Sequence, residues 1–87
     1  MDDFSGEKIQ FPVLCHYKII ADDHEGVQSA IEKVFLEVNI RVRFEKGRHS
    51  DHGKYVTFNA DIVIHSLALM RHIDGALRKI EGVKFVL

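Results

Sequence analysis

The clearest pattern of hydrophobic and polar positions lies in segment 55–62, where the two kinds of residue alternate. Val56, Phe58, Ala60 and Ile62 take one set of positions, and Tyr55, Thr57, Asn59 and Asp61 take the other. Because neighbouring residues of a strand point to opposite faces of its sheet, the alternation predicts a strand with one buried and one wet face. The sheet that contains this strand should therefore have a solvent-facing side.

Three other segments also predict strands. In segment 14–21, Cys15, Tyr17, Ile19 and Ala21 share an inner face, and Leu14, His16, Lys18 and Ile20 share an outer face. In segment 40–46, Ile40, Val42 and Phe44 point inward, and Arg41, Arg43 and Glu45 point outward. Segment 83–87 is short and apolar, with Lys84 as its one charge. The faces with charge-capable residues are placed outside.

Two segments between these strands have the spacing of amphipathic helices. The first carries Val27, Ala30, Ile31, Val34 and Val38 on one stripe, and the second carries Leu67, Met70, Ile73, Leu77 and Ile80. Apolar residues three and four positions apart lie on one side of a helix. We expect Asp22 and Asp23 to cap the first helix and Glu25 to lie in its first turn. The second helix should start near His65 and end at Gly82.

The predicted order, βαββαβ, defines an α+β fold. Right-handed crossovers join the halves of such a chain into a ferredoxin-like sandwich. We expect a four-stranded antiparallel sheet in the spatial order 4-1-3-2, with two helices on one face and the other face open. Residues 11–87 should form this single domain, behind a flexible leader at 1–10.

Composition narrows the classes of function. The chain has 87 residues and a formal net charge of -1 at pH 7, so no global basic field favours nucleic acid, which we do not expect to bind. No apolar run reaches the ~18 residues of a membrane span, so no membrane association is expected either. Cys15 is the single cysteine, which fits a reducing cytoplasm.

We expect neither an enzyme nor a cofactor. Cys15 and His16 are adjacent on a strand, so they point to opposite faces and make no thiol–base pair. His49 and His52, with Asp51 between them, are the best metal-ligand candidates, but a closed site usually needs four ligands and no second cluster matches. We therefore assign no metal. The sequence also lacks the run of aromatic residues on which RNA-recognition modules stack bases.

The chain resembles the YbeD-like family of bacterial proteins of unknown function. The resemblance runs from Phe11 to Leu87, and its markers are Phe11-Pro12, Lys18-Ile19, Ser50-x-x-Gly53-x-Tyr55, Leu77, Ile80, Val83 and Val86-Leu87. Two departures are Asp74-Gly75, where similar helices carry an aromatic residue, and Ile20-Ala21, where a glycine is frequent. The resemblance implies a small cytoplasmic protein with a ferredoxin-like fold, comparable to ACT regulatory domains, and it implies no catalytic residues.

The candidate binding surface is the open face of the sheet. Its predicted contact residues are His16, Lys18, Arg41, Arg43, Tyr55, Thr57 and Asn59. Cationic groups around a tyrosine could meet an anion, an acidic partner surface or RNA phosphates. A regulatory or adaptor module that binds a protein is the first hypothesis, against the alternative of an ordinary solvated face. The second hypothesis, by analogy with ACT domains, is a dimeric sensor that binds a small molecule near 21–26. The apolar edge at 83–87 would suit a homodimer.

Overall fold

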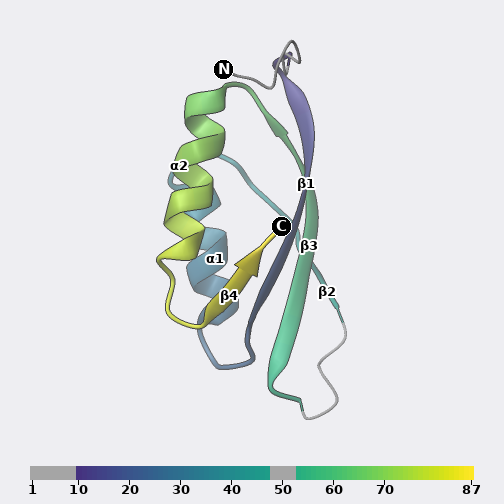
Figure 1. The fold of residues 1–87 in the computed structure, drawn as a ribbon, viewed down its shortest axis with the longest axis vertical. Coiled ribbons are helices and arrows are strands. Elements are labelled where there is room, and N and C mark those ends of the chain that lie inside the picture. Colours follow the sequence, from purple (N-terminus) through teal and green to yellow (C-terminus); the bar gives the residue numbers. More distant parts are fainter. Residues whose placement is uncertain (1–9, 48–52) are drawn as a thin grey trace.

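The computed structural model describes residues 10–47 and 53–87, and it places four strands in one sheet with two helices on one side (Figure 1). The elements are β1 (Val13–Asp22), α1 (Val27–Leu36), β2 (Glu45–Lys46), β3 (Tyr55–Ile64), α2 (Leu67–Arg78) and β4 (Val83–Val86). The expected leader, apart from its last residue, and the His49/His52 pair lie outside the described residues.

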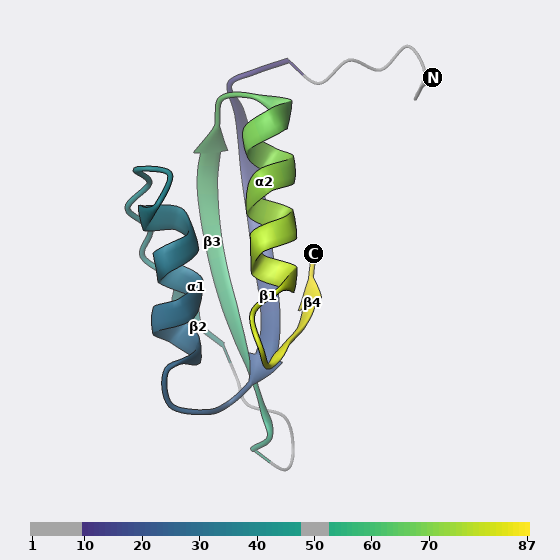
Figure 2. The same cartoon turned by 90° about the vertical axis from the view of Figure 1, so that its left-hand side faces the viewer.

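The sheet has the order β2-β3-β1-β4, with every pair antiparallel. Read from the β4 edge, this is the order 4-1-3-2. The two long central strands pair without interruption from Val13↔Ile64 to Asp22↔Tyr55. Both helices lie in front of the same face in the rotated view (Figure 2), which leaves the opposite face uncovered by helix in the described part of the chain. The ferredoxin-like fold class is therefore confirmed.

The alternation in the two long strands is confirmed by burial. Tyr17, Ile19 and Ala21 of β1 and Val56, Phe58, Ala60, Ile62 and Ile64 of β3 are all buried. Cys15, at the less covered end of β1, is only half-buried. β3 continues two residues past its expected end, through Val63 and Ile64, and so lengthens the open face.

The predicted strand at 40–46 is wrong in length. Only Glu45 and Lys46 pair with β3, opposite Asn59 and Phe58. The side chains of segment 40–44 nevertheless alternate between half-buried and exposed, and the apolar ones pack against the core. Alternating burial needs only an extended chain lying over the core, whereas a strand also needs a neighbour in register. The sequence pattern indicates an extended chain over the core, but it does not indicate whether a neighbouring strand pairs with it.

The predicted start of α1 is also wrong. Asp22 belongs to β1, where it pairs with Lys84 at 3.6 Å, and the helix begins at Val27 behind Gly26. Gly26 is the N-cap residue and has φ 93°, a left-handed conformation that favours glycine. Among the described residues, this N-cap position makes no side-chain capping bond. Backbone geometry therefore sets this terminus, so the acidic residues before it are not its caps.

The predicted helix stripes are correct at their centres and less so at their ends. In α2, Ile73 and Leu77 are fully buried, and Ser66 caps the helix by accepting a hydrogen bond from the Leu69 amide at 3.1 Å. Leu67, which we expected to be buried, is 41% exposed. In α1, the stripe omitted Phe35, which is completely buried. Val38 lies beyond the end of α1, although it packs against the core.

Candidate functional site

The open face is built from rows of side chains that cross the two central strands. Opposite residues of an antiparallel pair project from the same face of the sheet and contact each other. The outward rows are Leu14↔Val63, His16↔Asp61, Lys18↔Asn59 and Ile20↔Thr57. Phe85 of β4 lies beside Ile20 and extends the last row toward the edge. The face is therefore apolar at both ends and polar in the middle.

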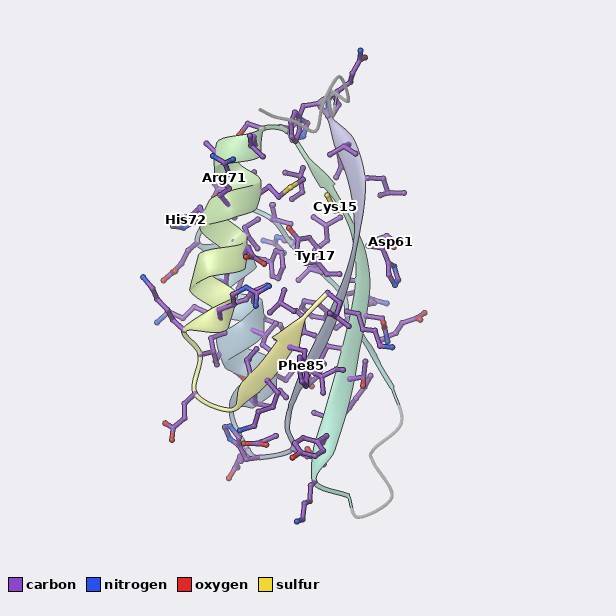
Figure 3. The ribbon with its side chains drawn as sticks, viewed as in Figure 1. Cys15, Tyr17, Asp61, Arg71, His72 and Phe85 are labelled. Atoms are coloured by element: carbon purple, nitrogen blue, oxygen red, sulfur yellow. The ribbon has the colours of Figure 1, made fainter. Side chains whose placement is uncertain are left out.

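The polar middle carries balanced charge. The Nδ1 atom of His16 lies 2.6 Å from Oδ1 of Asp61, and both side chains are well exposed. Asp61 projects from the side of the sheet opposite the helices (Figure 3). Together with these two residues, Arg43, Glu45 and Asn59 border a shallow depression of about 170 Å³. Because the acids Glu45 and Asp61 lie beside Arg43, this region is not a strongly basic patch.

Two apolar patches flank the polar middle. The Leu14 patch consists of Leu14 and Val63, which are 64% and 48% exposed. The Phe85 patch consists of Ile20, Tyr55 and Phe85, and these residues with Lys84 border a depression of about 340 Å³. Phe85 is 58% exposed. Water-exposed aromatic and aliphatic groups gathered on one face are typical of interaction surfaces.

The structure brings together some of the predicted contact residues and separates others. His16, Lys18, Arg43 and Asn59 lie close to one another in the polar middle. Tyr55 lies at the far end in the Phe85 patch, and Thr57 is half-buried beside Gly47. Arg41 lies instead beside α1, where it borders a depression with Glu32 and Leu36.

The contact set inferred from the sequence omitted Val63 and Phe85. Val63 follows the predicted end of its strand at residue 62, so the predicted alternation does not extend to it. Phe85 alternates with the buried Val86, and this alternation was the available signal. The four-residue strand is too short for that signal to separate its two faces without knowledge of the pairing.

A separate cavity of about 450 Å³, which is open to solvent, lies on the covered side of the sheet, between α2 and β1. Cys15 and Tyr17 project toward it from β1 (Figure 3). The Tyr17 hydroxyl is buried and has no hydrogen-bond partner among the described residues. Burial, with smaller contributions from Cys15 and from the Asp74 carboxylate, raises the pKa of Tyr17 to about 12. Burial also raises the pKa of the Cys15 thiol.

The pKa of Tyr17 predicts a loss of stability in alkali. The ordinary pKa of a tyrosine is 10.0, and the folded protein favours the neutral phenol of Tyr17. The stability that this preference contributes is therefore fully present below pH 10 and is lost as the pH rises toward about 12. We expect the free energy of unfolding to fall by about 2 kcal/mol across this range because of this group. Denaturant titrations of wild type and Tyr17→Phe at each pH measure the difference.

The control for this prediction follows from the tyrosine count. The chain has two tyrosines, so Tyr55→Phe leaves Tyr17 as the single phenol whose ionisation is seen by ultraviolet absorbance. An absorbance midpoint near pH 10 in that variant, or equal alkaline losses in wild type and Tyr17→Phe, would contradict the prediction.

Another cavity, of about 460 Å³, lies where the ACT analogy places a ligand. It is polar, and its lining includes Asp23, His24, Glu25, Gln28 and Ser29 from the β1–α1 connection and the start of α1. Within residues 10–47 and 53–87, no three His, Cys, Asp or Glu side chains are close enough together to hold a metal ion. Neither helix of that same part is long and apolar enough to cross a membrane.

Comparison with known sequences gives a family match. The profile of a family described as "Protein of unknown function (DUF493)" matches residues 6–87. A UPF0250 protein from Pseudomonas syringae pv. tomato is 33% identical over 89 residues, an alignment that covers 98% of this chain and 96% of that protein.

Solved structures share the fold at lower sequence identity. The solution structure of protein HP0495 from H. pylori has a TM-score of 0.73 and 18% identity, and the match covers 98% of this chain and 91% of that one. The ACT domain from GTP pyrophosphokinase of Chlorobium tepidum has a TM-score of 0.69 and 23% identity, covering 85% of this chain and 94% of that one.

Proposed function

This chain belongs to the DUF493 family of proteins of unknown function, and from that premise we propose that it is a non-catalytic regulatory or adaptor module. It binds a protein partner through the open face of its sheet. The observation that carries the proposal is the pair of apolar patches on that face, at Leu14 and at Phe85. A face that served only solubility would replace such groups with charged ones.

The layout of the face favours a protein over other partners. Apolar anchors around a polar strip match the composition of protein interfaces, where buried aromatic residues provide much of the binding energy. The charges on the face work against a nucleic acid, because Glu45 and Asp61 lie beside Arg43 and would repel phosphates. Lys18, Arg43 and His16 then contribute to orientation and to the rate of encounter rather than to most of the affinity.

Capture from an extract of the encoding bacterium tests this proposal. We expect wild type to retain a protein that Leu14→Asp/Phe85→Asp loses, and that purified partner should bind wild type directly. Lys18→Glu/Arg43→Glu should retain it more weakly than wild type. All three proteins should melt at similar temperatures, because each substituted side chain is largely exposed.

Controls separate the competing outcomes of the capture. Nuclease treatment should leave the capture unchanged, whereas its loss would indicate a nucleic-acid partner. Sedimentation equilibrium of wild type alone identifies self-association, which the apolar β4 edge would favour. If the Leu14→Asp/Phe85→Asp variant retains every protein that wild type retains, the open face is not the binding surface.

A second candidate function is an ACT-like sensor that binds a small molecule as a dimer. It is favoured by the structural similarity to an ACT domain and by the polar cavity beside Asp23 and Gln28. A ligand that binds only the dimer would shift both the melting temperature and the monomer–dimer equilibrium. A panel of amino acids and nucleotides that moves neither quantity would count against this candidate.

A further inference from the structure

The cavity between α2 and β1 has the size and the lining of a small-molecule binding site. β4 and the following Leu87 bond to β1 only from Lys18 onward. The preceding part of β1 pairs with β3 on one edge, and its other edge borders the cavity where β4 does not reach. Leu67 and Met70 of α2 line its other side. At about 450 Å³, its volume lies within the range of ligand pockets, which are mostly apolar with a few placed polar groups.

The polar groups of this cavity lie at Tyr17 and Asp74. Only 6% of Tyr17 is exposed, and its hydroxyl has no hydrogen-bond partner within the described chain. Leaving a buried hydroxyl unpaired costs about 1–3 kcal/mol, so an acceptor brought to it would be favoured. Asp74 accepts a bond from Nε of Arg78 through Oδ2, at 3.0 Å, and a carboxylate can accept further bonds at its other oxygen.

The lining also limits the charge of an occupant. Asp74 disfavours an anion, while Arg71 on the same helix disfavours a cation. His16 lines the same cavity, but its Nδ1 is bonded to Asp61 on the open face. The walls therefore suit an uncharged molecule that both accepts and donates one hydrogen bond.

We propose that this cavity binds a small, uncharged, aromatic or branched apolar molecule through one hydroxyl group. That hydroxyl accepts a hydrogen bond from Tyr17 and donates one to Asp74. The apolar body lies between Met70 and Leu67 on one side and Val86 on the other. Gly75 provides part of the space, because a Cβ atom at that position would meet nothing within 4 Å.

The test uses two probes that differ only in the hydroxyl group, p-isopropylphenol and cumene. We expect p-isopropylphenol to bind wild type roughly three- to tenfold more tightly than cumene, the ratio that a net hydrogen bond supplies. Amide chemical shifts that follow each titration report affinity and should move along α2 and β1. Cys15, the single cysteine, lines the cavity, so bound phenol should also slow its reaction with a thiol reagent.

Three variants locate the site. Gly75→Leu should occupy part of the cavity beside Asp74 and weaken binding, and as a helix substitution for glycine it should not weaken the fold. Ala68→Leu, at an exposed position of the same helix, is the matched control and should bind like wild type. Tyr17→Phe should remove the preference for the phenol over cumene while cumene binding remains.

Several results would overturn this assignment. Absence of binding to folded wild type would do so, as would phenol binding that Gly75→Leu leaves unchanged. Equal affinities for the two probes in wild type would show that the hydroxyl makes no specific bond. None of these readouts depends on the protein partner of the open face, so the two proposals stand or fail separately.

Discussion

Replacing Phe35 with alanine is expected to lower the free energy of unfolding by about 3–5 kcal/mol. The ring of Phe35 is completely buried, and it makes edge-to-face contacts with Tyr17 at 5.6 Å and Phe44 at 5.7 Å between ring centroids. It therefore links α1 to β1 and to the unpaired segment 40–44. A domain of this size has a total stability of about 4–13 kcal/mol, so the substitution removes a large part of it.

Leu36→Ala is the matched control for this prediction. Leu36 is the next residue of the same helix but is 55% exposed, so its truncation should change stability by no more than about 0.5 kcal/mol. Urea titrations of both variants and wild type, followed by circular dichroism, give the three free energies. A loss below about 1 kcal/mol for Phe35→Ala would mean that the contacts of its ring do not hold these elements together.

Phe35 also shows where sequence patterns stop being informative. The helix stripe through Val34 is real, but the adjacent Phe35 is buried as well. Spacing at three and four residues identifies one stripe, whereas α1 is covered by the sheet and by segment 40–44 at once, as the Phe35–Phe44 contact shows. A helix contacted from two directions buries neighbouring positions, and a single stripe cannot represent that.

The open face was predictable for the same reason that the long strands were. Alternation over the eight residues of segments 14–21 and 55–62 predicts which side chains face outward, and the strand pairing places His16, Lys18 and Asn59 on one surface as expected. The sequence places Arg41 on the same face only if all of segment 40–46 is a strand. Only Glu45 and Lys46 pair with β3, so the alternation of the segment does not place Arg41 on the open face.

The cavity could not be derived from the sequence. It depends on how far β4 extends along β1 and on the absence of a side chain at Gly75, which leaves space beside α2. The sequence showed that Asp74-Gly75 departs from the resemblance, but it did not show where that helix position would lie. Periodicity describes the faces of an element and not the distance between two of them.

Replacing Phe85 with alanine is expected to weaken binding of the purified protein partner by about 30-fold. This corresponds to the ~2 kcal/mol lost when a buried aromatic anchor is truncated. Phe85 is 58% exposed and has an apolar neighbour in Ile20, so a partner can cover both at little cost in desolvation. Lys18→Ala should weaken binding only a few-fold, and that effect should vanish at high salt because an exposed charge is screened.

Two further measurements make this comparison decisive. Leu36→Ala truncates an apolar residue of similar exposure, 55% against 58%, but on α1, and it should bind the partner like wild type. Calorimetric titrations at low and high salt then separate apolar from electrostatic contributions. If Lys18→Ala costs more than Phe85→Ala at both salt concentrations, charge and not apolar burial dominates the interface, and the Phe85 patch is not its anchor.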